Sequence, residues 1–368
     1  MTDIPVRIGI QQRVLPSYRV PFFDALAERC PQGLSVFAGA PRPGEGLSTG
    51  AAPLLAQAAR GKNVHLFSGK AYLCWQSGLM DWLDSWQPGL LVMEANPRYL
   101  QAGRAIAWMK ARGRRVIGWG LGSPAPAGSL AAQRLALRRH FIRHFDALIT
   151  YSQSGAQEYA ALGFPPGRIF VAPNAVAPMP RHPLPDRQPA YSPTPVVLFV
   201  GRLQARKQVD TLIHACAQLP PMLQPRLWII GDGSLRRELE ALAASLYPAA
   251  SFLGAQHGAE LEHAMRQADL FVLPGTGGLA VQQAMSFGLP VIVGRSDGTQ
   301  GDLVRPENGW TYAGDGPDAL RALLQNALED VKRLREMGAA SYRIVRDEVN
   351  LETMVAAFVH AIHSTLEV

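Results

Sequence analysis

The sequence predicts an α/β protein built from two parallel-sheet domains. Short apolar runs typical of buried strands alternate with helix-length segments, and this alternation occurs twice along the 368 residues. A chain of this length exceeds one ordinary hydrophobic core and suits two domains. The stretch from Pro178 to Pro195 holds seven prolines and few apolar residues, which is typical of a semi-rigid linker between domains.

The apolar runs also place the expected elements. In the first half, strands are expected at residues 6–10, 34–37, 90–94, 116–119, 147–151 and 169–172, with helices at 21–29, 101–111, 130–144 and 154–162. In the second half, strands are expected at 196–200, 227–230, 251–253, 270–273 and 291–293, with helices at 209–218, 235–245, 259–266, 318–337 and 351–366. We therefore expect a first domain over residues 1–177, a linker over 178–195, a second domain over 196–350 and a final helical segment over 351–368.

A glycine-rich turn gives the strongest indication of function. It follows the expected strand at 270–273, reads Gly275-Thr276-Gly277-Gly278, and leads into a helix that begins near Leu279. Such a turn presents backbone N–H groups and the positive end of a helix to an anion, and the diphosphate of a nucleotide-sugar fits there. The alternative is a tight strand–helix turn whose glycines serve packing only.

A second element, GRLQARK, follows the strand at 196–200. It places Arg202 and Lys207 just beyond the end of that strand, where open α/β sheets bind their ligands. Two fixed cations there suit a diphosphate, because they neutralise charge that develops on the leaving group. A solvated basic loop is the alternative. The strand at 227–230 also ends in a glycine turn, which begins at Gly231.

In this order and spacing, these elements resemble the retaining family-four glycosyltransferases, whose GT-B architecture has two Rossmann-like domains facing a cleft. The strand–GR–x4–K element of that family binds the donor diphosphate, which implies this role for Arg202 and Lys207. The resemblance also implies that the last helix packs back on the first domain. Together with the glycine turns, it gives a donor-binding set: Gly201, Arg202, Lys207, Gly231, Gly275, Thr276, Gly277, Gly278, Leu279 and Gln283.

The chain departs from this family at two positions. The family usually carries two glutamates eight positions apart, the first on donor-sugar hydroxyls and the second on the nucleotide ribose. The matching positions are Gly275 and Gln283. The Gln283 amide both donates and accepts, so it can still bind the ribose hydroxyls. Gly275 offers only its backbone.

Candidate acceptor groups lie in the first domain. The basic and aromatic segment after the first strand carries Arg13, Tyr18 and Arg19, although its aromatic residues could instead pack under the first helix. Glu94 closes the strand at 90–94, where it could orient an acceptor hydroxyl or take its proton. Pairing with Arg98 is the alternative for Glu94. Trp119, at the end of another strand, completes the acceptor side.

Charge and composition narrow the classes of partner. Residues 1–173 hold 19 Lys+Arg against 9 Asp+Glu, a net charge of +10, whereas the remainder holds 17 against 20, a net charge of −3. A basic first half favours an anionic membrane surface or a lipid-diphosphate acceptor. The basic helix at 130–144 either faces a membrane or is simply solvated. No nucleic-acid motif is present, so no nucleic-acid partner is expected.

Other classes of protein are not indicated. No run of 18 apolar residues occurs, the first residues lack a signal-peptide pattern, and the three cysteines are far apart, so we expect a cytoplasmic protein. No His/Cys cluster or acidic pair has metal-ligand spacing. We expect no metal and no cofactor, since a nucleotide-sugar is a substrate.

These observations lead to one main functional hypothesis. The chain is expected to be a retaining, metal-independent glycosyltransferase that moves a sugar from a nucleoside-diphosphate donor to a glycan or lipid-linked acceptor, with a role in cell-surface polysaccharide synthesis. Arg202, Lys207 and Glu94 are its candidate catalytic residues. Two alternatives stay open: a non-catalytic GT-B-like scaffold, motivated by Gly275, and a nucleotide-sugar 2-epimerase of similar architecture.

Overall fold

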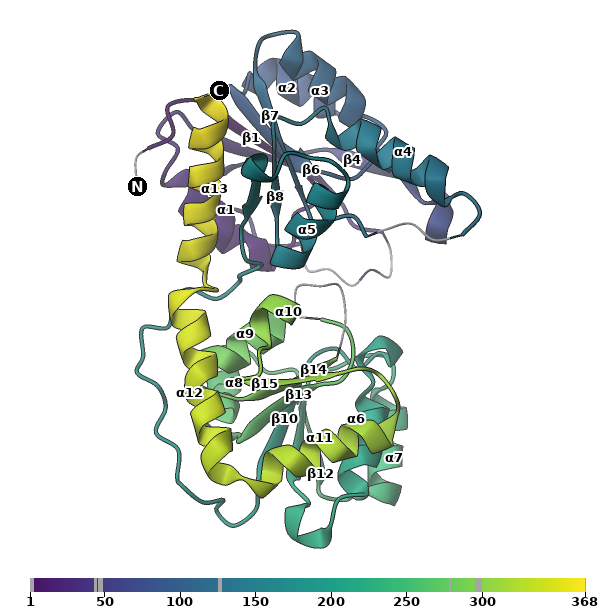
Figure 1. The fold of residues 1–368 in the computed structure, drawn as a ribbon, viewed down its shortest axis with the longest axis vertical. Coiled ribbons are helices and arrows are strands. Elements are labelled where there is room, and N and C mark those ends of the chain that lie inside the picture. Colours follow the sequence, from purple (N-terminus) through teal and green to yellow (C-terminus); the bar gives the residue numbers. More distant parts are fainter. Residues whose placement is uncertain are drawn as a thin grey trace. The chain divides into compact units, whose positions relative to one another are not determined.

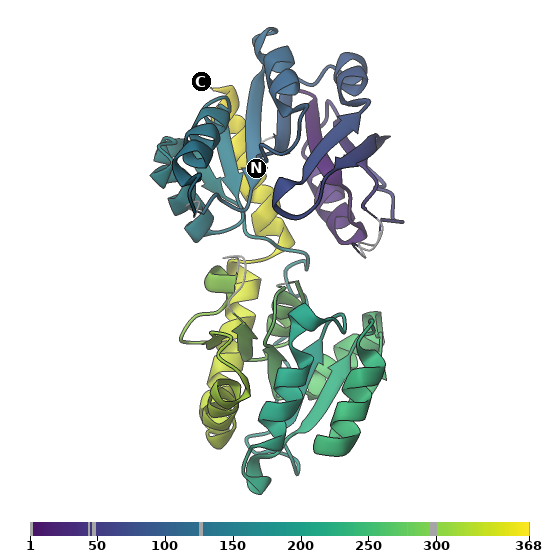
Figure 2. The same ribbon diagram turned by 90° about the vertical axis from the view of Figure 1, so that its right-hand side faces the viewer.

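The computed structural model of the protein describes residues 3–42, 45, 49–124, 128–277, 279–294 and 300–367. The chain folds into two compact units. Unit 1 combines residues 1–176 with 351–368, and unit 2 consists of residues 177–350. Each unit has a parallel sheet in its middle with helices on both faces (Figures 1 and 2).

Unit 1 is built on a seven-stranded sheet with the order β3-β2-β1-β6-β7-β8-β9, and all of its pairings are parallel. Its strands are β1 (Ile8–Val14), β2 (Leu34–Gly39), β3 (Gln57–Arg60), β6 (Leu90–Glu94), β7 (Arg115–Gly120), β8 (Ala147–Thr150) and β9 (Ile169–Val171). A separate antiparallel hairpin is formed by β4 (Lys62–Leu66) and β5 (Leu73–Ser77).

Two hydrophobic layers hold the unit 1 sheet between helices. On one face pack α1 (Val20–Ala27) and the last helix of the chain, α13 (Leu351–Leu366). The other face is covered by α2 (Leu79–Trp86), α3 (Ala102–Lys110) and α5 (Gln153–Ala161), with the end of α4 (Ala131–Ile142). The core of unit 1 therefore depends on residues from both ends of the sequence.

Unit 2 contains a six-stranded parallel sheet with the order β12-β11-β10-β13-β14-β15. Its strands are β10 (Val196–Val200), β11 (Arg226–Ile230), β12 (Ala250–Gly254), β13 (Leu270–Leu273), β14 (Val291–Gly294) and β15 (Gly309–Tyr312). Its helices are α6 (Val209–Ala217), α7 (Arg236–Leu246), α8 (Gly258–Gln267), α9 (Leu279–Ser286), α10 (Gln300–Leu303), α11 (Pro317–Glu329) and α12 (Val331–Asp347).

The predicted fold class is confirmed: both units are parallel α/β sheets of the Rossmann-like type. Several element predictions were wrong in detail. The first strand runs from Ile8 to Val14 instead of over residues 6–10. The helix expected at 318–337 is two helices, because the chain breaks at Asp330, whose side chain caps α12 by accepting from Arg333 N at 2.9 Å. The sequence analysis also missed β3, β4, β5, α2 and β15.

The proline-rich segment packs on unit 2 without forming a helix or strand. Arg187 fastens it: its guanidinium donates to the carbonyls of Met265 at 3.0 Å, Phe287 at 2.9 Å, Arg266 at 3.0 Å, and Ala268. Three of these carbonyls belong to the end of α8, where they lack helical partners. Burial, together with the nearby positive charge of Arg335, lowers the pKa of Arg187 to about 10.

The chain passes between the two units twice. In each unit, one polar side chain contacts both of the segments that lead to these crossings. In unit 1, the buried Arg19 donates to Asn174 Oδ1 and to Ala175 O before the first crossing, and contacts Met354 Sδ after the second. In unit 2, the buried Gln282 accepts from Ala177 N at 3.3 Å and donates to Val349 O at 2.7 Å. Each unit thus holds in place the two segments of its own chain that lead to the other unit.

We predict that Arg187→Ala lowers the free energy of unfolding by about 3 kcal/mol, because four backbone carbonyls lose a charged donor. Urea denaturation followed by circular dichroism measures this change. Arg181→Ala is the matched control, since Arg181 is an exposed arginine on the same segment, and it should change stability by less than about 0.5 kcal/mol. Equal effects of the two substitutions would contradict a fastening role for Arg187.

Candidate functional site

The predicted donor residues of unit 2 gather at the carboxyl ends of its central strands. Gly201 follows β10 and Gly231 follows β11, and the Gly201 N–H donates to Ile230 O at 3.0 Å. Gly231 has φ +140°, and a Cβ there would lie 1.9 Å from Gly201 O. A glycine is therefore required at Gly231 for the two strand ends to approach each other.

Two loops meet at this edge of the sheet. A 3₁₀ turn over Ala205–Lys207 lies against the glycine turn after β13. Thr276 joins them three times. Its N–H donates to Arg206 O at 3.0 Å, its hydroxyl accepts from Arg206 Nη1 at 3.2 Å, and its carbonyl accepts from Lys207 Nζ at 2.5 Å. The structure thus brings Arg206, Lys207 and Thr276 together, and the sequence analysis had left Arg206 out of the site.

Lys207 is the buried cation of this edge. Its side chain is only 9% exposed, whereas Arg202 and Arg206 are exposed. Burial, together with the positive charges of Arg206 and Arg202, lowers the pKa of Lys207 to about 8. Three cations therefore lie close together on one loop. Their mutual electrostatic repulsion decreases when an anion binds among them.

Gly275 lies at a point where no side chain fits. A Cβ at this position would lie 2.1 Å from Arg206 O and 2.5 Å from Lys207 Cα, so the backbone of the 3₁₀ turn occupies the space of a side chain. A Cβ at Gly277, which has φ +134°, would lie 2.3 Å from Lys207 Nζ. Both glycines are needed for the close approach of the two loops.

The other predicted donor residues lie on or beside α9. Leu279 is its first residue and Gln283 lies one turn later, with a partly exposed side chain. The adjacent Gln282 is fully buried and holds the chain crossings instead. Gly278 lies outside the described residues. The spacing of Gln283 from the glycine turn suits a ribose contact, which remains a prediction.

Unit 1 carries a cavity of about 600 Å³ at the carboxyl ends of β6, β7 and β8. Its lining includes Glu94 at the end of β6, Gly120 at the end of β7 and Tyr151 just past β8. Arg134 and Arg138 of α4 complete one wall, and Arg98 belongs to the loop after β6. The cavity lies at the edge of the sheet where ligands of open α/β folds bind.

Glu94 lies in this cavity with a perturbed acidity. Loss of hydration raises the pKa of its carboxyl to about 7, although it accepts from Arg13 N at 2.9 Å and from the Tyr99 hydroxyl. No ion pair joins Glu94 to Arg98 among the residues that the structure describes, so pairing does not explain its position. A carboxyl that titrates near neutral pH suits proton transfer. Tyr99 lies five residues after Glu94, and no motif in the sequence pointed to it.

The remaining predicted acceptor residues separate. Arg13 lies on β1, where its guanidinium pairs with Glu45 at 3.0 Å. Tyr18 is exposed, but Arg19 is only 5% exposed and is bonded within unit 1, which corrects its assignment to the acceptor side. Trp119 is 2% exposed, lines the cavity, and packs against Phe358 of α13 with ring centroids 4.8 Å apart.

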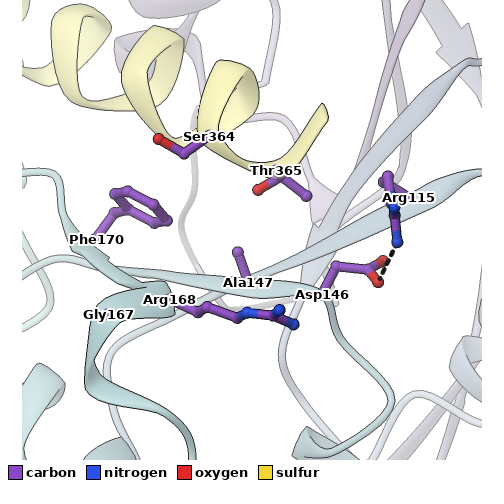
Figure 3. A pocket seen from close by; sticks show the side chains of 8 residues that line it. All are labelled: Arg115, Asp146, Ala147, Gly167, Arg168, Phe170, Ser364 and Thr365. Carbon is purple, nitrogen blue, oxygen red and sulfur yellow. Dashed lines mark ion pairs between the residues drawn. The ribbon is translucent and has the colours of Figure 1, made fainter. Parts of the chain in front are cut away.

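A smaller cavity of about 150 Å³ lies at the opposite edge of the same sheet (Figure 3). It is lined by residues that include Arg115 at the start of β7, Asp146 just before β8, and Thr365 in the last turn of α13. Asp146 accepts from Lys110 Nζ at 2.5 Å and from Val116 N at 2.7 Å, and it pairs with Arg115 at 3.5 Å. Its carboxylate is satisfied by the fold, so we assign this cavity no ligand.

Among the residues that the structure describes, no group of three or more His, Cys, Asp or Glu side chains is placed to share a metal ion. None of the helices over these residues has the length and apolar character needed to span a bilayer.

Comparison with protein families assigns both halves of the chain. Residues 24–175 match the family described as glycosyl transferase 4-like domain, and residues 181–344 match glycosyl transferases group 1. The chain carries two glycosyltransferase domains. The predicted glycosyltransferase assignment is confirmed by these matches, and the predicted GT-B fold by the structural neighbours below.

Individual relatives support the same assignment. A GDP-mannose-dependent monoacylated alpha-(1-6)-phosphatidylinositol monomannoside mannosyltransferase of Corynebacterium glutamicum is 33% identical over 172 residues, which are 44% of this chain and 45% of that protein. The matched region thus spans about half the length of this relative.

Two solved structures are similar in fold over nearly the whole chain. Anabaena Alr3699/HepE, in complex with UDP, has a TM-score of 0.69 at 16% identity and covers 99% of this chain and 100% of its own. The lipopolysaccharide outer core galactosyltransferase WaaB has a TM-score of 0.68 at 17% identity, with 97% and 99% covered.

We predict that Gly275→Ala destabilises the glycosyltransferase by about 1–3 kcal/mol, because the added methyl group forces the 3₁₀ turn away from the glycine turn. Urea denaturation measures the loss, and Gly275→Glu should show it as well. Gly301→Ala is the control, since a Cβ at Gly301 meets no atom within 4 Å among the described residues. A stable Gly275→Glu variant with tighter donor binding would contradict this account.

Proposed function

We propose that the protein is a retaining glycosyltransferase that transfers a sugar from a nucleoside-diphosphate donor to a glycan or lipid-linked acceptor. The observation that carries this proposal is the cluster of Arg202, Arg206 and Lys207 against the glycine turn of unit 2. A nucleotide diphosphate supplies the negative charge that this cluster lacks. The named ligand of Anabaena Alr3699/HepE is UDP, and the Corynebacterium relative is named for GDP-mannose, so we leave the nucleobase open.

In this proposal the donor is bound by backbone and cations together. Lys207 exchanges its bond to Thr276 O for a phosphate oxygen, and Arg202 pairs with the same diphosphate. The Gln283 amide contacts the ribose in place of the usual glutamate. The cations stabilise charge on the departing diphosphate, which is the requirement of front-face attack with retention. This part of the mechanism needs no metal ion.

The acceptor half of the proposal rests on the cavity of unit 1. Glu94 accepts a hydrogen bond from the acceptor hydroxyl and takes its proton as the new glycosidic bond forms. Tyr99 and the Arg13 backbone N–H orient this carboxylate. Relatives named for phosphatidylinositol mannoside and lipopolysaccharide core suggest a role in glycolipid or surface polysaccharide synthesis. The +10 charge of residues 1–173 supports peripheral association with the cytoplasmic face of a membrane.

A non-catalytic scaffold is the second candidate, because Gly275 gives the donor sugar no carboxylate. The persistence of the cation cluster favours the enzyme. Release of nucleoside diphosphate from a panel of nucleotide-sugars, with and without glycan acceptors, separates the two. Acceptor-dependent release supports transfer, and binding without release supports the scaffold.

We predict that Arg202→Ala and Lys207→Ala each weaken nucleoside-diphosphate binding by about 1.5–3 kcal/mol, because each removes a charge-assisted hydrogen bond. Calorimetric titration in EDTA measures the affinity. In the wild type, affinity should fall as the pH rises above about 8, since Lys207 then loses the proton that the anion requires. This pH dependence should disappear in Lys207→Ala. Affinities that do not change in either variant would remove the basis for the donor site.

We predict that Glu94→Gln lowers acceptor-dependent transfer by about 100-fold and leaves nucleoside-diphosphate affinity unchanged. The wild-type rate should rise with pH through about 7, because the carboxylate form is the proton acceptor and the pKa of Glu94 is raised to about 7. The variant should lack this limb of the pH–rate profile. A Glu94→Gln variant that retains the wild-type profile would show that another group takes the proton.

A further inference from the structure

The cavity of unit 1 is unusually positive for a sugar-binding site. Among the residues that the structure describes, three arginines line it, Arg98 on the loop after β6 and Arg134 and Arg138 on α4, and Glu94 is the only carboxylate in the lining. Because the pKa of Glu94 is raised to about 7, that carboxyl is only partly charged at neutral pH. An anionic ligand complements such a lining better than a neutral glycan does.

The arginines come from two separate elements that converge on one space. Arg134 and Arg138 are one turn apart on α4 and therefore share a face of that helix. Arg138 donates to Pro124 O, which fixes the side chain over the loop after β7. Within the described residues, no carboxylate lies within ion-pair distance of Arg98 or Arg138, although Arg138 is near enough to Glu158 to oppose the rise that burial causes in the pKa of that carboxyl. A ligand can therefore reach Arg98 and Arg138 without displacing a direct ion pair.

The same wall also carries apolar side chains. Leu137 of α4 and Leu121 of the loop after β7 line the cavity, and these side chains are 62% and 46% exposed. Trp119, another lining residue, buries an indole N–H that donates to no acceptor in the part of the chain described. The cavity thus combines guanidinium groups, apolar surface and an unsatisfied donor within about 600 Å³.

Building on the proposed glycosyltransferase function, we propose that the acceptor carries a phosphoryl group close to the hydroxyl that receives the sugar, and that Arg98, Arg134 and Arg138 bind it. Guanidinium groups bind phosphoryl oxygens in a bidentate manner and keep their charge at all relevant pH values. Since Glu94 lines the same cavity, the phosphoryl group and the reacting hydroxyl lie within one or two sugar units of each other. Either a lipid-linked phosphate or a soluble sugar phosphate satisfies this chemistry.

The test measures binding of inorganic pyrophosphate, geranyl phosphate and glucose 1-phosphate to the full chain by calorimetry. The donor site is first saturated with nucleoside diphosphate, so that these probes report only on unit 1. The double variant Arg134→Gln/Arg138→Gln should weaken pyrophosphate binding by about tenfold or more for each arginine lost. Methyl glucoside, a neutral probe, should bind both proteins equally.

A matched control lies on the same helix. Arg139 is adjacent to Arg138 on α4 but does not line the cavity, so Arg139→Gln should leave the affinity within about twofold of the wild type. Circular dichroism checks that all variants fold. Equal losses in Arg139→Gln and the double variant, or no loss in the double variant, would overturn the proposal, because general surface charge would then account for binding.

Two further arms separate the sources of the anion. Tighter binding of geranyl phosphate than of glucose 1-phosphate supports a lipid-linked acceptor, and the reverse order supports a soluble sugar phosphate. Binding to phosphatidylglycerol vesicles without binding of any monomeric phosphate would overturn the proposal in favour of a membrane-facing surface. If no nucleoside diphosphate binds, the donor proposal fails independently of this one. The same titrations are then run on the Arg202→Ala/Lys207→Ala variant, in which two of the unit 2 cations are removed.

Discussion

The close approach of two backbone segments controls the donor edge of unit 2. The 3₁₀ turn with Lys207 and the glycine turn with Thr276 lie so near each other that position 275 has no room for a side chain. This contact places Lys207 Nζ on Thr276 O and buries the ammonium group, which in turn lowers its pKa. The bare backbone at Gly275 and the lowered pKa of Lys207 therefore have one physical cause.

In both units, the candidate ligand-binding residues are different from the polar residues that hold the chain crossings. Each unit places its candidate ligand groups at the carboxyl ends of parallel strands and uses a different buried polar side chain, Arg19 or Gln282, for the chain crossings. Arg19 and Tyr18 are adjacent in sequence, as are Gln282 and Gln283. In both pairs one residue is buried in the scaffold and its neighbour is left accessible. In unit 2, one peptide bond therefore separates the residue that holds the crossings, Gln282, from the predicted ribose contact, Gln283.

Much of the fold could be predicted from the sequence, because buried parallel strands leave continuous apolar runs. The runs at 90–94, 196–200 and 270–273 match β6, β10 and β13 residue for residue. The missed strands β3 and β4 are largely exposed, so polar residues interrupt any such run. The spacing of Arg202, Lys207 and the glycine turn was enough to group them at one edge. Burial of Arg19 and the shifted acidity of Glu94 depend on contacts with distant residues, which spacing does not reveal.

The discontinuous make-up of unit 1 has a consequence for the biosynthesis of the protein. Apolar residues of α13, among them Met354 and Phe358, belong to the same core as Phe22 and Ile117. A ribosome releases the chain from its first residue onward, so the first 176 residues emerge with this face of their sheet covered by α1 but not by α13. Unit 2 is continuous and has its whole core available earlier. The part of the chain made second is therefore the first that can finish folding, and the first part must keep its exposed apolar surface from aggregating until translation ends.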